Sequence, residues 1–203
     1  MIVLAVDTTG ERLSFALGRG DGRPPLTRSS FSKRPHDERL FEEAGRLLRA
    51  AGLERGDLDA LVAASGPGRF TGIRVGLTFA TMLASALGVP AVAVTLFEAL
   101  AHREALAGGA GRVCVVLPAF RGELFLQEFV LARGKAKPAA PPRWIDAASA
   151  GKAEAEAGRR ARLLRGEVRA ADLLGPALVR LGGRRRSPAL PLYLKPANFQ
   201  RPA

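Results

Sequence analysis

Three side chains near the start of the sequence could handle a phosphate group. Asp7 follows the apolar run at 2–6, and Thr8 and Thr9 come directly after it. A carboxylate at a strand end can hold the metal ion that accompanies a nucleotide, and threonine hydroxyls can bond to its phosphates. The same residues also suit an Asx turn, in which Asp7 accepts hydrogen bonds from the following backbone. We favour the turn and keep Asp7, Thr8 and Thr9 as weak candidates for phosphate binding.

A second candidate is the turn Ser65-Gly66-Pro67-Gly68, which precedes an apolar helical segment. Glycines permit a sharp turn, and N–H groups at a helix start can hold an anion. Thr71 is the expected N-cap of this helix. The spacing is not a dinucleotide fingerprint, since a third glycine would have to stand at Thr71, and no Lys-Ser/Thr pair follows as in a P-loop. The turn alone is therefore a weak phosphate site.

Residues that could bind a metal or act as a nucleophile are few and scattered. His36 and His102 stand far apart and fit no ligand spacing, and we expect His102 on the surface. The single cysteine, Cys114, lies in the apolar run 112–117, which is typical of a small core residue. The sequence therefore predicts no catalytic residue, no metal and no cofactor. An intrachain disulfide is impossible, and no secretory signal is expected.

The predicted elements that must position these residues follow an informative order. Apolar patterns predict strands at 2–6, 12–17 and 26–31, then a helix that begins at His36 or Asp37 and ends near Gly52. A strand at 58–64, a helix at 72–87, a strand at 91–94 and a helix at 97–106 follow. The order β-β-β-α-β-α-β-α resembles the ribonuclease-H-like half-domain of actin and the sugar kinases.

The second half begins again with two strands, at 113–117 and 123–131, as a worn copy of the first would. The Pro/Ala/Arg-rich stretch 134–143 is expected to be a loop, followed by a helix near 171–181 and an extended tail at 190–194. We therefore expect an α/β, actin-like (ASKHA) fold with two lobes, residues 1–105 and a reduced second lobe at 106–203.

The helix at 72–87 has an unusual surface. Small residues recur every four positions, and Arg74 is its only charged residue. Rows of small residues leave grooves that let another element approach closely. Either the domain covers this helix entirely, or part of it is exposed for a partner, and the pattern alone leaves both open. Gly88 and Pro90 limit the helix to about 15 residues, too short to cross a bilayer, so we expect no membrane contact.

Charge is distributed unevenly along the chain. The net charge is +12, yet residues 1–105 carry 13 Lys+Arg and 12 Asp+Glu, whereas residues 106–203 carry 18 and 7. A strongly basic half is typical of proteins that bind nucleic acid. General overuse of arginine is the alternative, and charge alone favours it.

Several motifs together resemble one family. The opening Ile2–Thr9, the stretch Ser65–Leu77, Gly88-Val89-Pro90 before the strand, and the late Pro191-Leu192-Tyr193-Leu194 look like the TsaB (YeaZ-like) family. The resemblance covers residues 1–105 well and the rest loosely. The Gly66–Gly76 element is shared with the catalytic paralogue of that family, TsaD.

The resemblance implies a role without catalysis. TsaD-like proteins bind a metal through two histidines four residues apart, and those positions fall here on Leu96 and Leu100. The chain is then a cytoplasmic accessory subunit that dimerises with and activates a TsaD-like enzyme for threonylcarbamoyl-adenosine modification of tRNA. A TsaE-like ATPase and tRNA join the complex, and a homodimer is expected for the chain alone. The implied partner interface lies on the helices at 37–51 and 72–87 and comprises Leu40, Ala44, Leu47, Gly72, Val75, Gly76, Phe79, Ala80, Leu83 and Ala84.

Two other functions stay open. Asp7 and the Gly66–Gly72 turn would suit a nucleotide-binding or nucleotide-hydrolysing member of the actin-like superfamily, although phosphate and adenosine elements are not evident in the second half. The basic second half would suit a tRNA-binding module, although it lacks interleaved aromatic residues. One departure from the TsaB pattern is the segment 118–123, which has no Asp-Ala-Arg sequence.

Overall fold

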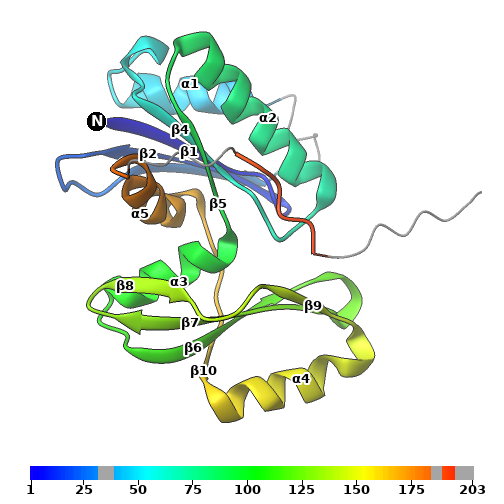
Figure 1. Ribbon diagram of the computed structural model, residues 1–203. Coiled ribbons are helices and arrows are strands. Elements are labelled where there is room, and N and C mark those ends of the chain that lie inside the picture. Colours follow the sequence, from blue (N-terminus) through cyan, green and yellow to red (C-terminus); the bar gives the residue numbers. More distant parts are fainter. Residues whose placement is uncertain (32–38, 184–188, 195–203) are drawn as a thin grey trace, which may run out of the picture.

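The structure, a computed structural model, describes residues 1–31, 39–183 and 189–194, and it has two lobes (Figure 1). The first is built on a five-stranded sheet of order β3-β2-β1-β4-β5. Strands β1 (Ile2–Asp7), β2 (Arg12–Arg19) and β3 (Leu26–Phe31) are antiparallel neighbours, whereas β4 (Ala60–Ala64) and β5 (Ala91–Val94) run parallel to β1. This is the ribonuclease-H-like order that the sequence predicts.

Helices cover both faces of this sheet, which explains why its central strands are apolar throughout. Helices α1 (Leu40–Ala50) and α2 (Phe70–Leu87) pack on one face, and α5 (Ala170–Leu181) packs on the other. A 3₁₀ turn, η1 (Arg55–Asp57), follows α1. The division of the chain at residue 105 therefore does not hold for α5, which comes late in the sequence and returns to the first lobe.

Helix α3 (Leu96–Leu106) lies between the two lobes (Figure 1). Thr95 caps its start: the Thr95 Oγ1 accepts a hydrogen bond from Glu98 N at 3.1 Å, and Glu98 accepts one from Thr95 N at 2.9 Å. Ala99 belongs to the core beneath α5, while Phe97 and Leu100 belong to the core of the second lobe. Because α3 contributes to both cores, it joins the lobes through apolar packing.

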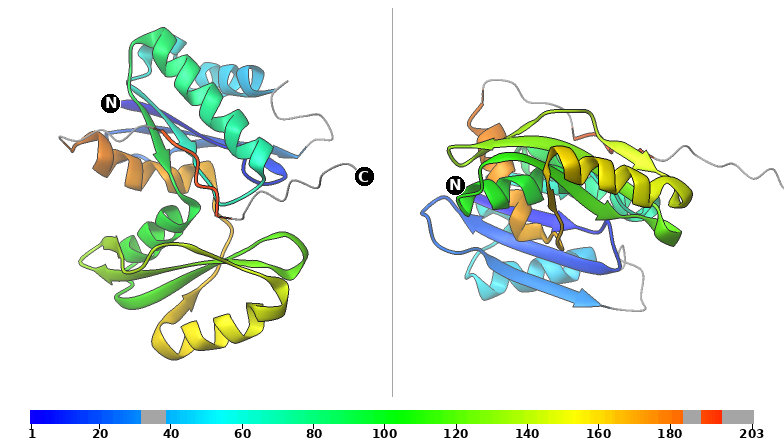
Figure 2. Two further views of the ribbon diagram at one scale, coloured as in Figure 1. Left: turned by 45° about the vertical axis from the view of Figure 1, so that its right-hand side comes forward. Right: turned by 90° about the horizontal axis from the view of Figure 1, so that it is seen from below.

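The second lobe carries a smaller sheet of order β10-β6-β7-β8, with β9 also paired to β7. Its strands are β6 (Gly111–Pro118), β7 (Leu124–Ala132), β8 (Lys135–Pro138), β9 (Arg143–Ile145) and β10 (Arg162–Leu164), and η2 (Phe120–Gly122) joins the first two. Helix α4 (Ala147–Arg160) lies on the face opposite α3, seen from below in Figure 2. Cys114 is buried beneath α4, as a core residue should be.

Two features of this lobe differ from the predictions. The expected loop at 134–143 contains β8, because Arg133 and Gly134, with φ of 50° and 71°, form a tight hairpin turn without the Asn-Gly pair that usually signals one. Helix α4 was not predicted. Only Ala150 and Ala157 are buried on it, so its sequence lacks the large apolar stripe that marks an amphipathic helix.

Helix boundaries also differ. The predicted start of the first helix, at His36 or Asp37, lies outside the described residues. Helix α2 begins at Phe70 with Arg69 as its N-cap, so the prediction of Thr71 as cap is wrong. At 18 residues α2 exceeds the expected 15, and by length and composition it is apolar enough to cross a membrane. Its packing on the first sheet is that of a core helix.

Candidate functional site

The backbone of α2 lies in direct contact with the loop that follows β1. A Cβ atom at Gly72 would stand 2.1 Å from the Thr8 carbonyl oxygen, and one at Gly76 would stand 2.4 Å from the Thr8 hydroxyl. A Cβ at Gly68 would meet Thr9 in the same way. Real Cβ atoms do not approach so closely, so only glycine fits at these positions. The first small residues of α2 therefore serve a contact within the chain.

Hydrogen bonds lock this contact. The Thr8 hydroxyl donates to the Gly72 carbonyl at 2.7 Å, and Arg69 N donates to the Thr9 carbonyl at 2.8 Å. Thr9 donates to the Asp7 carboxylate from its backbone N–H and from its hydroxyl, at 2.9 and 2.7 Å. The Asx turn favoured by the sequence is thus confirmed. Both threonine hydroxyls already donate inside the protein, which leaves neither available to a phosphate.

The surroundings of Asp7 also disfavour an anion. Asp7 lines a pocket of about 320 Å³ together with Glu11, Glu167 and one nearby cation, Arg12. Arg12 forms an ion pair with Glu167 at 3.2 Å. Three carboxylates around one paired arginine give a negative pocket, in which a phosphate would be repelled.

A larger, mainly apolar pocket of about 890 Å³ opens between the lobes. Phe70 and Ile73 line it from the first lobe, and Phe120 and Phe125 from the second. Tail segment 189–194 forms a further wall: Leu192 N donates to the Ser65 carbonyl at 2.8 Å, and the Tyr193 ring lies 4.8 Å from that of Phe70. The tail therefore contacts the turn Ser65-Gly66-Pro67-Gly68 through a backbone hydrogen bond.

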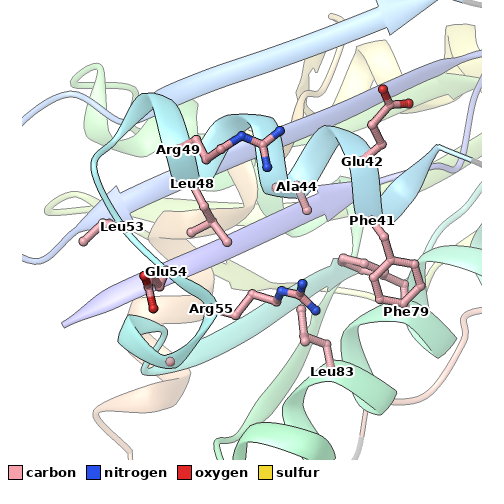
Figure 3. A pocket seen from close by; sticks show the side chains of 12 residues that line it. Phe41, Glu42, Ala44, Leu48, Arg49, Leu53, Glu54, Arg55, Phe79 and Leu83 are labelled. Atoms are coloured by element: carbon pink, nitrogen blue, oxygen red, sulfur yellow. The ribbon is translucent and has the colours of Figure 1, made fainter.

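The most distinctive surface of the first lobe is a groove between α1 and α2, with a volume of about 510 Å³ (Figure 3). Phe41 projects from α1 and meets Phe79 edge-on, with ring centroids 5.1 Å apart. Phe41 is 60% exposed although it is a large apolar residue. Leu48 and Leu83 line the floor, while Arg49 and Arg55 stand at the rim. The groove thus presents apolar area with cations beside it.

The residues predicted to contact a partner lie mostly beneath this surface. Ala80 is 1% exposed, and the rest of the set is buried apart from Val75, which is half-buried. Ala44, Phe79 and Leu83 also line the groove, whereas Gly72 and Gly76 pack on the Thr8 loop. The partner interface on these two helices therefore stays a prediction. Beyond Phe70 and Arg74 near its start, the exposed side chains of α2 are uncharged, namely Thr71, Thr78, Thr81, Met82, Ser85 and Ala86. Met82 is 62% exposed, and no row pattern in the sequence distinguished it.

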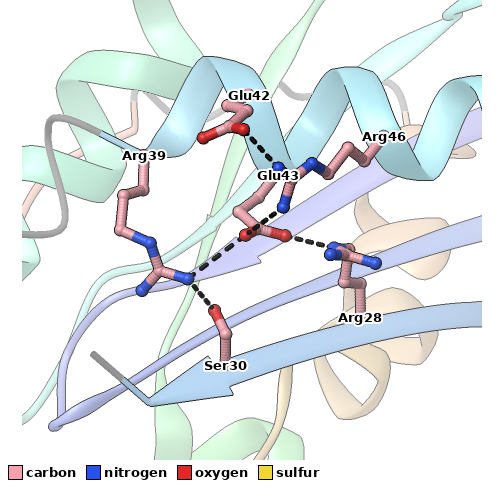
Figure 4. Close-up of polar contacts among 6 residues, drawn as sticks. All are labelled: Arg28, Ser30, Arg39, Glu42, Glu43 and Arg46. Atoms are coloured by element: carbon pink, nitrogen blue, oxygen red, sulfur yellow. Dashed lines mark hydrogen bonds and ion pairs between the residues drawn. The ribbon is translucent and has the colours of Figure 1, made fainter.

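A buried carboxylate holds α1 in place (Figure 4). Glu43 lies on the apolar face of α1 and is 3% exposed. It accepts hydrogen bonds from Arg28 of β3 and, at 3.2 Å, from Arg39, and Arg46 stands 3.5 Å away. Burial opposes ionisation of Glu43, but Arg28 and Arg39 outweigh it and hold its pKa below the ordinary value. This network attaches the helix that bears Phe41 to the edge strand β3.

The positions that the resemblance equates with metal ligands hold apolar side chains packed in cores. Leu100 is buried and Leu96 is half-buried. His102 is also half-buried, not a surface residue as expected, because its ring packs against Gly175 of α5; burial lowers its pKa. Within the described ranges, no group of three His, Cys, Asp or Glu residues could hold a metal ion.

The order of the strands and the helices on both faces of the first sheet define a two-lobed protein of the actin-like (ASKHA) class. Two solved structures from Pseudomonas aeruginosa share this arrangement at 30% sequence identity. One, described as YeaZ, covers 95% of this chain and 99% of its own with a TM-score of 0.77; the other, an uncharacterized protein similar to peptidase YeaZ, covers 96% and 99% with 0.78.

Comparisons of the sequence with known families and proteins lead to the same group of relatives as the structures. The family model of TsaD, tRNA N6-adenosine threonylcarbamoyltransferase, matches residues 30–168, more than half of the chain. The tRNA threonylcarbamoyladenosine biosynthesis protein TsaB of Escherichia coli is 32% identical over 129 residues, 64% of this chain and 55% of that protein. TsaB of Bacillus subtilis is 37% identical over 101 residues, 50% and 44%. The chain belongs to the TsaB (YeaZ-like) family, and it spans about half the length of the curated relatives it matches.

The contact between α2 and the Thr8 loop yields a prediction about stability. We expect Gly72→Ala to lower the free energy of unfolding by about 3 kcal/mol or more, because the new methyl group meets backbone that cannot move aside. The control is Gly151→Ala in α4, where a Cβ meets nothing within 4 Å and should stabilise by about 0.5–1 kcal/mol. Chemical denaturation measures both; equal effects would contradict the contact.

The Glu43 network yields a second prediction. Because the folded-state pKa of Glu43 is lowered, its contribution is complete above the ordinary carboxyl value of 4.5 and is lost as the pH falls through the folded-state value. We expect Glu43→Gln to cost about 1–3 kcal/mol at pH 7 and much less at pH 3. Denaturant unfolding at both values measures this. Glu42→Gln, a change at the exposed neighbour, is the control, and an equal pH dependence in both variants would refute the assignment.

Proposed function

We propose that this chain is a non-catalytic accessory subunit in threonylcarbamoyl-adenosine modification of tRNA, and that it pairs with and activates a TsaD-type catalytic subunit. The observation that carries the proposal is the exposed apolar surface of α1 and α2, which comprises the groove lined by Phe41 and the exposed Met82 of α2. Membership of the TsaB family supplies the pathway; the groove supplies a surface on which a partner can dock.

The chemistry of this surface suits a protein partner. Docking buries surface, and every charge covered without a counter-charge costs free energy. On α2 the exposed side chains are hydroxyls, small groups and one thioether, apart from Phe70 and Arg74 near its start, which stack on each other at 3.9 Å. Methionine and phenylalanine are common in the buried part of protein interfaces. This face of α2 could therefore be covered with little loss from desolvation, while the charged residues at the groove rim need counter-charges on the partner.

Support for a non-catalytic role comes from the residues that occupy the positions equated with a metal site and from those at the end of β1. Leucine stands at both positions equated with the metal ligands of TsaD-like proteins, and the leucines fill cores. Asp7, Thr8 and Thr9 are engaged with one another and with α2. Activation would then come from contact with the catalytic subunit, with a TsaE-like ATPase and tRNA joining the assembly in the cytoplasm.

The pairing predicts a position-specific loss of complex formation. Met82→Arg places a charge on the docking surface and should weaken the complex with a TsaD homologue by about 10- to 100-fold. Val179→Arg is the matched control, because Val179 is 68% exposed on α5, on the other face of the sheet. Co-purification followed by titration calorimetry measures both. If the wild type forms no complex, or both variants lose it equally, the proposal fails.

The same surface predicts self-association of the isolated chain. An exposed apolar groove is covered by a second copy when no partner is present, so we expect homodimers whose fraction rises with concentration. Met82→Arg should shift the chain toward monomers, and Val179→Arg should not. Sedimentation velocity over a range of concentrations measures this, and a wild type that stays monomeric throughout would count against an apolar docking surface.

A further inference from the structure

The second lobe carries a group of basic side chains that the pairing with a catalytic subunit does not use. Arg112, Lys135, Lys137 and Arg143 lie on the three strands β6, β8 and β9, and Arg159 and Arg160 lie in the last turn of α4; all six are exposed. We call these six residues the cationic face. Residues 106–168, which form this lobe, carry 11 Lys+Arg and 6 Asp+Glu.

Strand register places the four strand residues on one side of the sheet. Arg112 stands directly opposite Val130, which in turn stands opposite Lys137, so that the three form a row across β6, β7 and β8. Arg143 is two residues from Ile145, which packs beneath α4 with Cys114. Since side chains alternate along a strand, these cations share the α4 side of the sheet. Helix α4 covers only part of this side of the sheet (Figure 2), and all three residues of the row are exposed.

Acidic residues neutralise little of this charge. Arg112 lies 3.6 Å from Glu128, a pair across neighbouring strands. Over the described ranges, no ion pair involves Lys135, Lys137, Arg143, Arg159 or Arg160. Other arginines of this lobe, such as Arg162 and Arg165, are paired with Glu104 and Glu154. The unpaired cations are therefore concentrated on one side of the lobe, where they reinforce one another's field.

We propose that the cationic face binds the phosphate backbone of RNA, and in the setting of the proposed function that of the tRNA substrate. Phosphate contacts position a nucleic acid without reading its sequence, and a flat array of Lys and Arg is suited to that task. An anionic membrane fits less well. Membrane-surface elements insert large apolar side chains, whereas here Val130 is the one large exposed apolar residue in the row, and α4 offers only alanines.

The location is compatible with simultaneous binding. Helix α4 lies at one end of the molecule, and the helices α1 and α2 that form the groove lie at the opposite end (Figure 1 and the left view of Figure 2). RNA held on α4 and its neighbouring strands would leave the groove open for the catalytic subunit. The identity of the RNA as the tRNA substrate rests on the proposed function. RNA binding itself needs only the cations of this chain and can be tested without a partner.

Binding of an unmodified tRNA transcript to the full chain tests the proposal. Fluorescence anisotropy across a salt series should give an affinity that falls with salt, with a slope set by the number of phosphate contacts. We expect Lys135→Ala/Lys137→Ala to weaken binding about 5- to 20-fold and to reduce the slope by about 1.5–2. The control Arg23→Ala/Arg69→Ala removes two exposed cations from the first lobe, outside the α1–α2 groove, so the net charge changes equally, and should weaken binding less than about 2-fold.

The proposal that the cationic face binds RNA fails if the wild-type protein does not bind tRNA at low salt, or if the two double variants lose tRNA affinity equally. It also fails if the chain binds phosphatidylserine vesicles but not tRNA. Both double variants should melt within a few degrees of the wild type, since all four residues are exposed. Complex formation with the TsaD homologue is measured in parallel. If Lys135→Ala/Lys137→Ala keeps both that complex and its tRNA affinity, the face is wrong and the accessory role stands.

Discussion

The contact between α2 and the loop after β1 fixes much of the first lobe. Three glycines, Gly68, Gly72 and Gly76, bring helix backbone against Thr8 and Thr9 at distances that no side chain would allow. Once α2 lies there, its rotation about its own axis is determined. Phe79 turns toward the sheet and toward Phe41, and Met82 turns toward solvent. The character of the exposed groove is thus a consequence of a backbone contact on the other side of the helix.

The two lobes differ in what they offer to other molecules. The first lobe is nearly neutral in charge and exposes apolar area between two helices, held by the buried Glu43 and its arginines. The second lobe has a reduced sheet and a strongly basic side. Between the lobes, Asp7 and Thr9 bond to each other and carboxylates surround them.

Much of the first lobe could be predicted from the sequence, because apolar runs at 2–6 and 58–64 and the glycine-rich turn allow few alternatives. The Asx turn at Asp7 was also predictable, since Asp-Thr-Thr after a strand has a local structure of its own. Contacts between distant segments could not be deduced. Nothing local indicates that α5 returns to the first sheet, that Arg133-Gly134 forms a hairpin turn, or that the row of Gly72 and Gly76 faces Thr8. Most residues predicted to contact a partner are buried, although Ala44, Phe79 and Leu83 line the groove. The exposed Met82 had no distinguishing pattern.

The tail segment at 189–194 has a mechanical consequence. It bonds to Ser65 and stacks Tyr193 on Phe70 in the first lobe, while Leu192 and Leu194 pack against the core of the second. Any change in the angle between the lobes would have to break these contacts of the tail, in addition to bending the two connections through α3 and before α5. The tail therefore opposes movement of one lobe against the other, and with it any change in the separation between the α1–α2 groove and the α4 side of the second sheet.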